Sequence, residues 1–208
     1  METTWWRRNR FWLALLLPLL LLALGASSFR LVTLYRPWQW TDAIVAAGPT
    51  GTLHQEFLGT DDVRHTRTVT VAVDGLRTVP ALGADAAAPG ATLWQVDLTL
   101  SAAPDQVLQG CEIELVGPDG TRYATNAAGK VPADPDDSFW LPALVLPCVP
   151  EDAPGPVMGL TGLEPATVER PDAWPVVAAA AIPDGVEPTA VRIMWQRPTY
   201  LELTAPAS

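Results

Sequence analysis

Two histidines and three carboxylates lie within twelve residues and could together bind a transition metal. They are His54, Glu56, Asp61, Asp62 and His65. Imidazole nitrogens and carboxylate oxygens are ligands for zinc and copper, and a hairpin between the histidines would bring these groups together. The alternative is a set of polar side chains on an edge hairpin exposed to water. These residues are therefore weak candidates for a metal site, and the sequence indicates no bound cofactor.

Other patterns typical of catalysis are sparse. Asp134, Asp136 and Asp137 could offer oxygen ligands to calcium, but the glycine and the distal glutamate of a calcium loop are missing, which favours a solvated turn. The sequence has no nucleophile elbow, zinc-protease or phosphate-loop pattern. We therefore expect no enzymatic activity, with an unrecognised envelope hydrolase as the less favoured alternative.

Four tryptophans beyond residue 90 could lie in the core or contact a partner. Trp94 and Trp195 alternate with polar residues and are expected in the core. Trp140 and Trp174 are flanked by loop residues and are the possible partner contacts, although a place in the core is favoured for each.

The N-terminus predicts where these residues work. Residues 11–29 carry no charge and, as a helix, would span about 28 Å, close to the thickness of the hydrocarbon layer. Arg7, Arg8 and Arg10 precede this stretch, which favours a cytoplasmic N-terminus and an extracytoplasmic remainder. The organisation we expect is a cytoplasmic N-terminus (1–10), a transmembrane signal anchor (11–35), a juxtamembrane connection (36–52) and an extracytoplasmic domain (53–208).

A cleaved signal peptide is the competing interpretation of the same stretch. Its apolar region would run over residues 11–24, with Gly25, Ala26, Ser27 and Ser28 behind it. Both interpretations place the remainder of the chain outside the cytoplasm. The anchor predicts a single-pass protein of the cell membrane.

The two cysteines, Cys111 and Cys148, both follow the membrane segment. Two cysteines in an oxidising compartment usually pair, so we expect a structural disulfide between them. Closing a loop of this length would contribute about 4 kcal/mol in the chain-entropy treatment.

The charge of the chain excludes one class of partner. Residues 41–208 contain 22 acidic and 8 cationic side chains, and the whole chain carries a net charge of −10. Such a surface repels phosphates, so we expect no nucleic-acid binding. It suits either a solvated exterior or a cationic partner.

Apolar and polar residues alternate along most of this region, which is typical of half-buried strands. The clearest runs are residues 68–73, 94–101, 111–115 and 191–196. Residues 139–146 and 176–182 are more continuously apolar, although the alanines at 178–181 are also compatible with a helix. Turns are expected at 73–75, 117–120 and 183–185, and a first strand or helical turn around 41–47. About seven strands separated by such turns predict an all-β, immunoglobulin-like antiparallel β-sandwich after one transmembrane helix.

An alternating strand is followed by a strand with an Asp-Gly hairpin in the stretches ATLWQVDLTL (91–100) and IELVGPDGTRY (113–123). These two stretches resemble the bacterial telokin-like domains, which are immunoglobulin-like modules of Gram-positive cell-surface proteins. The resemblance covers about 35 residues, and the proline-rich segment 147–172 departs from it. It implies a fold and a location at the membrane, with no catalytic residues. The high use of alanine, proline and arginine over lysine also fits a GC-rich, actinobacterial genome.

These observations together predict a membrane-anchored accessory module that binds another membrane or envelope protein. The alternatives are an extracytoplasmic zinc- or copper-binding protein that uses the region of His54 and His65, and the hydrolase. The sequence indicates no small-molecule substrate.

Overall fold

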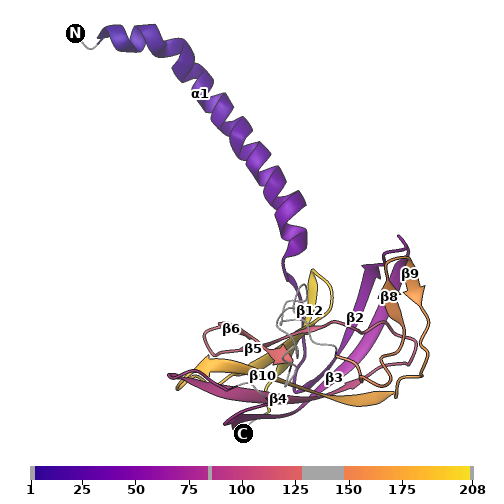
Figure 1. Ribbon diagram of the computed structural model, residues 1–208. Helices are drawn as coiled ribbons and strands as arrows, with labels where there is room; N and C mark the ends of the chain where they lie inside the picture. The colour runs from indigo at the N-terminus through magenta and orange to yellow at the C-terminus, as the bar shows by residue number, and fades with distance from the viewer. Residues whose placement is uncertain (1–2, 84–85, 128–147, 207–208) are drawn as a thin grey trace, which may run out of the picture. The chain divides into compact units, whose positions relative to one another are not determined.

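The computed structural model describes residues 3–83, 86–127 and 148–206. The chain divides into two units, Met1–Thr41 and Asp42–Ser208. The first unit is helical and the second is built from β-strands (Figure 1).

The helical unit begins with α1 (Thr3–Arg30) and continues as a π-helical turn (Leu31–Tyr35) and a 3₁₀ turn (Arg36–Trp38). Its stretch Arg7–Tyr35 is 29 residues long, and none of its most apolar part is buried in the structure. Pro18 lies within the helix without ending it. A helix of this length is about 40 Å long, more than the hydrocarbon thickness of about 30 Å. The prediction of an N-terminal helix long and apolar enough to span a membrane is confirmed.

Two five-stranded sheets and a small hairpin make up the second unit (Figure 1). The first sheet has the strand order β1 (Asp42–Val45), β12 (Thr199–Thr204), β11 (Ala190–Met194), β5 (Glu112–Val116) and β6 (Arg122–Ala124). The second sheet has the order β2 (Thr50–Leu58), β3 (Arg64–Val79), β4 (Ala91–Ser101), β10 (Ala173–Pro183) and β7 (Asn126–Ala127). The separate hairpin pairs β8 (Val157–Gly159) with β9 (Gly162–Glu164).

The order of the strands is that of an immunoglobulin-like sandwich. The order β3-β4-β10-β7 corresponds to strands A-B-E-D, and β12-β11-β5 corresponds to G-F-C. The chain changes sheets between β4 and β5 and again between β10 and β11. As a result β4 pairs with β10 in one sheet and β5 pairs with β11 in the other, as in a Greek key. The predicted β-sandwich is confirmed, with one parallel pair, β1 with β12, among otherwise antiparallel neighbours.

The core lies between the two sheets because alternate residues of each strand point inward. Leu98 and Leu100 of β4 are buried opposite Ile193 of β11 and Leu201 of β12, in one cluster of buried side chains. Ala178 and Ala180 of β10 join this cluster, so the alanine run is a strand rather than a helix. Pairing with β4 along all of β10 overrides the helix propensity of alanine. Trp94 and Trp195 are partly buried against the cluster, as expected.

Two expected boundaries differ from the structure. The segment 36–52 is not simply a connection, because β1 and the start of β2 lie within it and β1 pairs with the strand β12. The sandwich therefore begins at Asp42 instead of residue 53. Residues 73–75 are not a turn: β3 continues through them with a bulge between Val73 and Gly75. The carboxylate of Asp74 accepts a hydrogen bond from the Thr99 hydroxyl (2.6 Å) of the neighbouring strand, which accommodates the bulge.

The outer face of the first sheet carries a row of charges across three strands. Arg192 of β11 lies between Glu114 of β5 and Glu202 of β12, and its Nε donates to Glu202 (2.7 Å). Burial raises the pKa of Glu114, although Arg122 and Arg192 lower it in part. Its buried Oε2 accepts no hydrogen bond from any described residue. The ionised form of Glu114 is therefore disfavoured in the folded protein.

We expect Glu114→Gln to raise the stability of the sandwich at pH 7 by up to about 0.5 kcal/mol. A carboxyl whose pKa is raised on folding binds more protons folded than unfolded, so its contribution to stability falls as the pH rises above about 4.5. The gain of the variant should accordingly vanish at pH 4. Thermal unfolding of the full-length protein in non-ionic detergent at both pH values measures this difference. Glu56→Gln, at an exposed site, is the control, and a loss of stability for Glu114→Gln at pH 7 would contradict the prediction.

Candidate functional site

The predicted metal ligands are not brought together. His54 and Glu56 lie on the outer face of β2, whereas His65 is paired with Phe57 and shares the inner face. Successive residues of a strand point to opposite faces, so the two imidazoles cannot bind one ion. His54 instead contacts the Thr68 hydroxyl (3.0 Å), and Glu56 forms an exposed ion pair with Arg64 (3.6 Å). Over residues 3–83, 86–127 and 148–206, no three His, Cys, Asp or Glu side chains are placed to share a metal ion.

The other members of that cluster organise the turn between β2 and β3. Asp61 accepts a hydrogen bond from the Val63 backbone N–H (3.1 Å), which lowers the pKa of its carboxyl. The His65 imidazole, 3.1 Å from the same carboxylate, lowers it further. Asp62 takes up a positive φ of 59° in this turn, a conformation that Asp tolerates. These residues therefore shape a hairpin, as in the alternative interpretation of the sequence.

The two cysteines form the predicted disulfide. Cys111 and Cys148 are both buried in the core cluster, with their Cα atoms 5.7 Å apart. Cys111 directly precedes β5, so the bond attaches the beginning of the proline-rich segment to the first sheet. The aspartates at 134, 136 and 137 and Trp140 lie outside the described residues.

Trp174 is a structural residue and not a partner contact. Its side chain is only 3% exposed, and its indole N–H donates to the Cys148 carbonyl (3.0 Å). The guanidinium of Arg170, itself 1% exposed, lies 4.7 Å from the centre of the Trp174 ring. Alternation along β10 turns the Trp174 side chain inward, which overrides its loop-like surroundings in the sequence.

Arg170 holds the proline-rich segment in place. Its two terminal nitrogens donate to the carbonyls of Ala103 (2.9 Å) and Pro154 (3.2 Å). Gly155, with a φ of 78°, gives the guanidinium room, because a Cβ there would lie 2.6 Å from its Nη1. Burial lowers the pKa of Arg170, and the charge of Asp105 raises it in part. The segment 148–172 is therefore attached at the disulfide, at Trp174 and at Arg170.

A second buried cation lies on the inner face of β3. Arg67 is 5% exposed and its guanidinium stacks over the Phe57 ring at 3.9 Å. Burial lowers the pKa of Arg67 to about 10. Gln55, its partner across the strands, donates through Nε2 to the Gln196 carbonyl. This end of the sandwich thus has a polar interior that the alternating pattern of the sequence does not reveal.

Exposed apolar side chains gather where two hairpin ends meet. The Thr60 hydroxyl of the β2–β3 turn donates to the Gly159 carbonyl of the β8–β9 hairpin, so the two ends lie side by side (Figure 1). We call the exposed apolar residues of these ends the hairpin patch: Leu58, Val63, Leu160 and Leu163. Leu160 is 95% exposed, which is unusual for a leucine.

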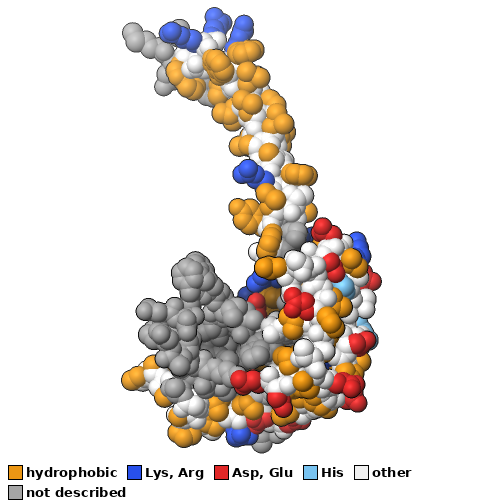
Figure 2. Space-filling model, turned by 45° about the vertical axis from the view of Figure 1, so that its right-hand side comes forward, with side chains coloured by type: hydrophobic (Ala, Val, Ile, Leu, Met, Phe, Trp, Pro, Cys, Tyr) orange, Lys and Arg blue, Asp and Glu red, His pale blue; other side chains and the backbone are white. Residues whose placement is uncertain are grey.

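A groove continues from the hairpin patch through Leu163. The groove has a volume of about 350 Å³ and is lined by Pro104, Asp105, Pro156, Leu163, Pro165, Ala166 and Glu169. Its walls are apolar except for the two carboxylates. The segment 148–172 that forms most of it has five acidic side chains and one cation, the buried Arg170. We call this surface the acidic groove. More generally, acidic and hydrophobic side chains are intermixed on the face of the molecule that Figure 2 shows.

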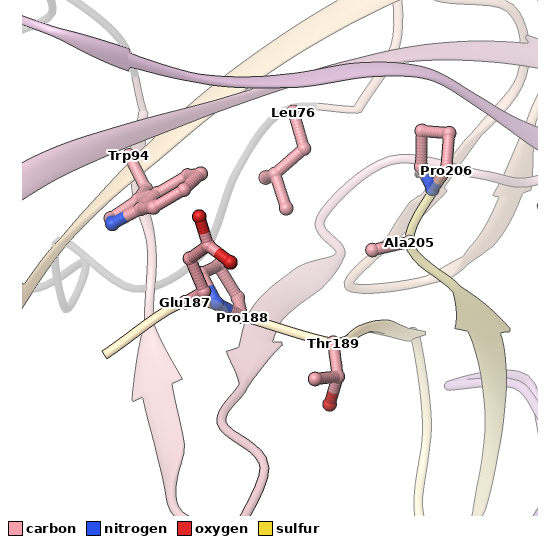
Figure 3. Close-up of a pocket in the computed structure, with 7 residues that line it drawn as sticks. All are labelled: Leu76, Trp94, Glu187, Pro188, Thr189, Ala205 and Pro206. Atoms are coloured by element: carbon pink, nitrogen blue, oxygen red, sulfur yellow. The ribbon is translucent and has the colours of Figure 1, made fainter. Parts of the chain in front are cut away.

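A second cavity, of about 310 Å³, opens at the end of the sandwich where β4 begins (Figure 3). It is lined by Leu76, Trp94, Glu187, Pro188, Thr189, Ala205 and Pro206. Neither cavity could be identified from the sequence, because each combines residues from loops far apart in the chain.

The fold defines the class of the second unit as a β-sandwich. A solved structure that resembles it is an uncharacterised β-sandwich protein from Clostridium difficile 630, with 9% sequence identity and a TM-score of 0.35. The likeness covers 81% of this chain and 97% of that one. No protein family matches the chain. No curated protein matches it either.

Proposed function

We propose that this protein is a membrane-anchored, extracytoplasmic binding module that associates with another membrane or envelope protein. The observation that carries the proposal is the acidic groove with the hairpin patch beside it. The module would use this surface to contact a partner that presents basic and apolar side chains.

Two features of the chain support a location at the membrane. The apolar stretch Arg7–Tyr35 is long enough to remain as an anchor, and the arginines before it favour an N-terminus inside the cell. A disulfide between buried cysteines suits an oxidising compartment. The resemblance to telokin-like domains of Gram-positive surface proteins points to the same location, and the composition to an actinobacterial source.

The chemistry of the acidic groove supports a protein partner. An extended peptide could place aliphatic groups against the prolines and Leu163, and cationic groups beside Asp105 and Glu169. The hairpin patch would add apolar area, with Leu160 as the side chain that gains most from burial, about 1.5–3 kcal/mol. Because Arg170 and the disulfide hold the segment in place, little ordering would oppose binding.

Affinity purification of the full-length protein from its own membranes in mild detergent tests the proposal. We expect one integral-membrane or secreted protein in near-equal amount with the wild type. Leu160→Asp, and separately Asp105→Lys/Glu169→Lys, should each reduce its recovery at least about tenfold, since both place a charge where the partner is apolar or basic. Quantitative mass spectrometry of the eluates gives the recovery.

Val45→Asp is the matched control, because Val45 is also an exposed apolar residue (69%) but lies on β1, outside the hairpin patch. It should leave recovery unchanged. Recovery of no stoichiometric partner by the wild type would contradict the binding function. Equal recovery by all variants would instead contradict the assignment of this surface.

A further inference from the structure

The cavity at the end of the sandwich exists because one sheet is longer than the other. The strands of the first sheet end there at Val116, Ala190 and Thr204, which lie side by side. In the second sheet, β4 and β10 continue to the pair Ala91 and Pro183. No strand in the described part of the chain lies opposite the inner face of this overhang. The loop before β11 and the residues after β12 cover it only in part.

Two apolar side chains of the overhang form the floor of this cavity. Trp94 lies on the inner face of β4, and Leu76 lies on the neighbouring strand, where it pairs with Val96. Pro188, Ala205 and Pro206 complete the apolar lining. Its volume of about 310 Å³ is at the lower end of the range for sites that bind small molecules.

Among the described residues of the lining, Glu187 is the only charged one. Its carboxylate points into the space between the Trp94 ring and Leu76 (Figure 3). None of the side chains that the structure describes forms a hydrogen bond or ion pair with Glu187. The remaining polar side chain, Thr189, contacts the Val116 carbonyl (3.4 Å). An exposed carboxylate without a partner among the described side chains therefore lies beside an indole ring at the edge of an apolar cavity.

We propose that this cavity binds a small organic cation, an ammonium group carried on a compact apolar body. The indole face attracts a cation through its quadrupole, and the Glu187 carboxylate attracts the same charge from the other side. Leu76 and the prolines take up the apolar part of the ligand. A neutral ligand of equal shape gains only the apolar contacts, and an anion is repelled by Glu187.

Titration of the full-length protein in non-ionic detergent with benzylammonium tests the site. Labelling with 5-fluorotryptophan gives each tryptophan a fluorine resonance, and Trp94→Phe identifies the one from Trp94. We expect that resonance to shift and to saturate below about 10 mM ligand. Glu187→Gln should weaken binding about fivefold, in the range of one lost cation contact at a partly exposed site.

Benzyl alcohol, of the same shape but neutral, is the matched ligand, and Glu164→Gln, in β9 and outside the cavity, is the matched variant. The alcohol should shift the Trp94 resonance less than benzylammonium does. Glu164→Gln should bind benzylammonium as the wild type does, unlike Glu187→Gln. Unchanged resonances of the other tryptophans show that each variant is folded. An equal shift with benzyl alcohol, no shift of the Trp94 resonance, or full affinity in Glu187→Gln would each overturn the proposal. None of these outcomes depends on the acidic groove.

Discussion

Removal of the disulfide in Cys111→Ala/Cys148→Ala is expected to lower the free energy of unfolding by about 4 kcal/mol. The bond joins residues 37 positions apart, and without it the unfolded chain regains the entropy of that open loop. Both sulfurs are buried in the core cluster, so their loss also removes packing. For a domain of this size, the melting temperature should fall by about 10 °C.

Thermal and denaturant unfolding of the full-length protein in detergent measure this loss. Each single variant should lose about as much as the double variant, because either substitution breaks the same bond. Oxidised wild type treated with a reductant after unfolding should refold with the stability of the double variant. A loss below about 1 kcal/mol in the double variant would show that the loop gains little freedom when the bond is absent.

The second large effect is expected from Arg170→Met, which should cost about 3 kcal/mol. The variant leaves the carbonyls of Ala103 and Pro154 without the charged donor that now reaches both. Hydrogen bonds to charged groups contribute about 1.5–3 kcal/mol each. Part of their loss is offset because the variant no longer has to bury a cation. Because the contacts of Arg170 lie at Ala103, Pro154 and Trp174, the effect should be concentrated in the segment 148–172.

Hydrogen exchange and limited proteolysis locate this effect, since local opening exposes backbone that the folded protein protects. We expect faster exchange and cleavage in residues 148–172 and little change in β3 and β4. Arg64→Met is the control, because that side chain is 82% exposed and should change stability by less than about 0.5 kcal/mol. An Arg170→Met variant at least as stable as the wild type would show that the cost of burying the cation exceeds its hydrogen bonds.

Arg170→Met also connects stability with the proposed function. The acidic groove is lined on one side by residues 156–169, which Arg170 attaches to Ala103, next to the groove residue Pro104. If the acidic groove is the contact surface, recovery of the partner should fall together with the protection of this segment. Unchanged recovery in a variant with a mobile segment would leave only the β2–β3 part of the hairpin patch, Leu58 and Val63, as the contact surface.

The sequence by itself determined the apolar helix, the β-sandwich class and the disulfide. These follow from signals that are local or nearly so: an uncharged run of residues, alternation along single strands, and two cysteines with no other cysteine to pair with. The hairpin at residues 117–120 belongs with them, because Gly117 and Thr121 close it through their own backbones (2.8 Å). Such features depend on residues that are close together in the chain, so they can be predicted from the amino-acid sequence.

Only the tertiary structure decided which residues meet. Alternation does not state which strands are neighbours, so nothing in the sequence separated His54 from His65. The short strand β1 has little periodicity of its own, and it forms because it pairs with β12, which lies more than 150 residues later in the chain. The acidic groove and the cavity at Glu187 arise from the same cause. Each is formed by loops that strand pairing brings together, and that pairing is a property of the whole folded chain.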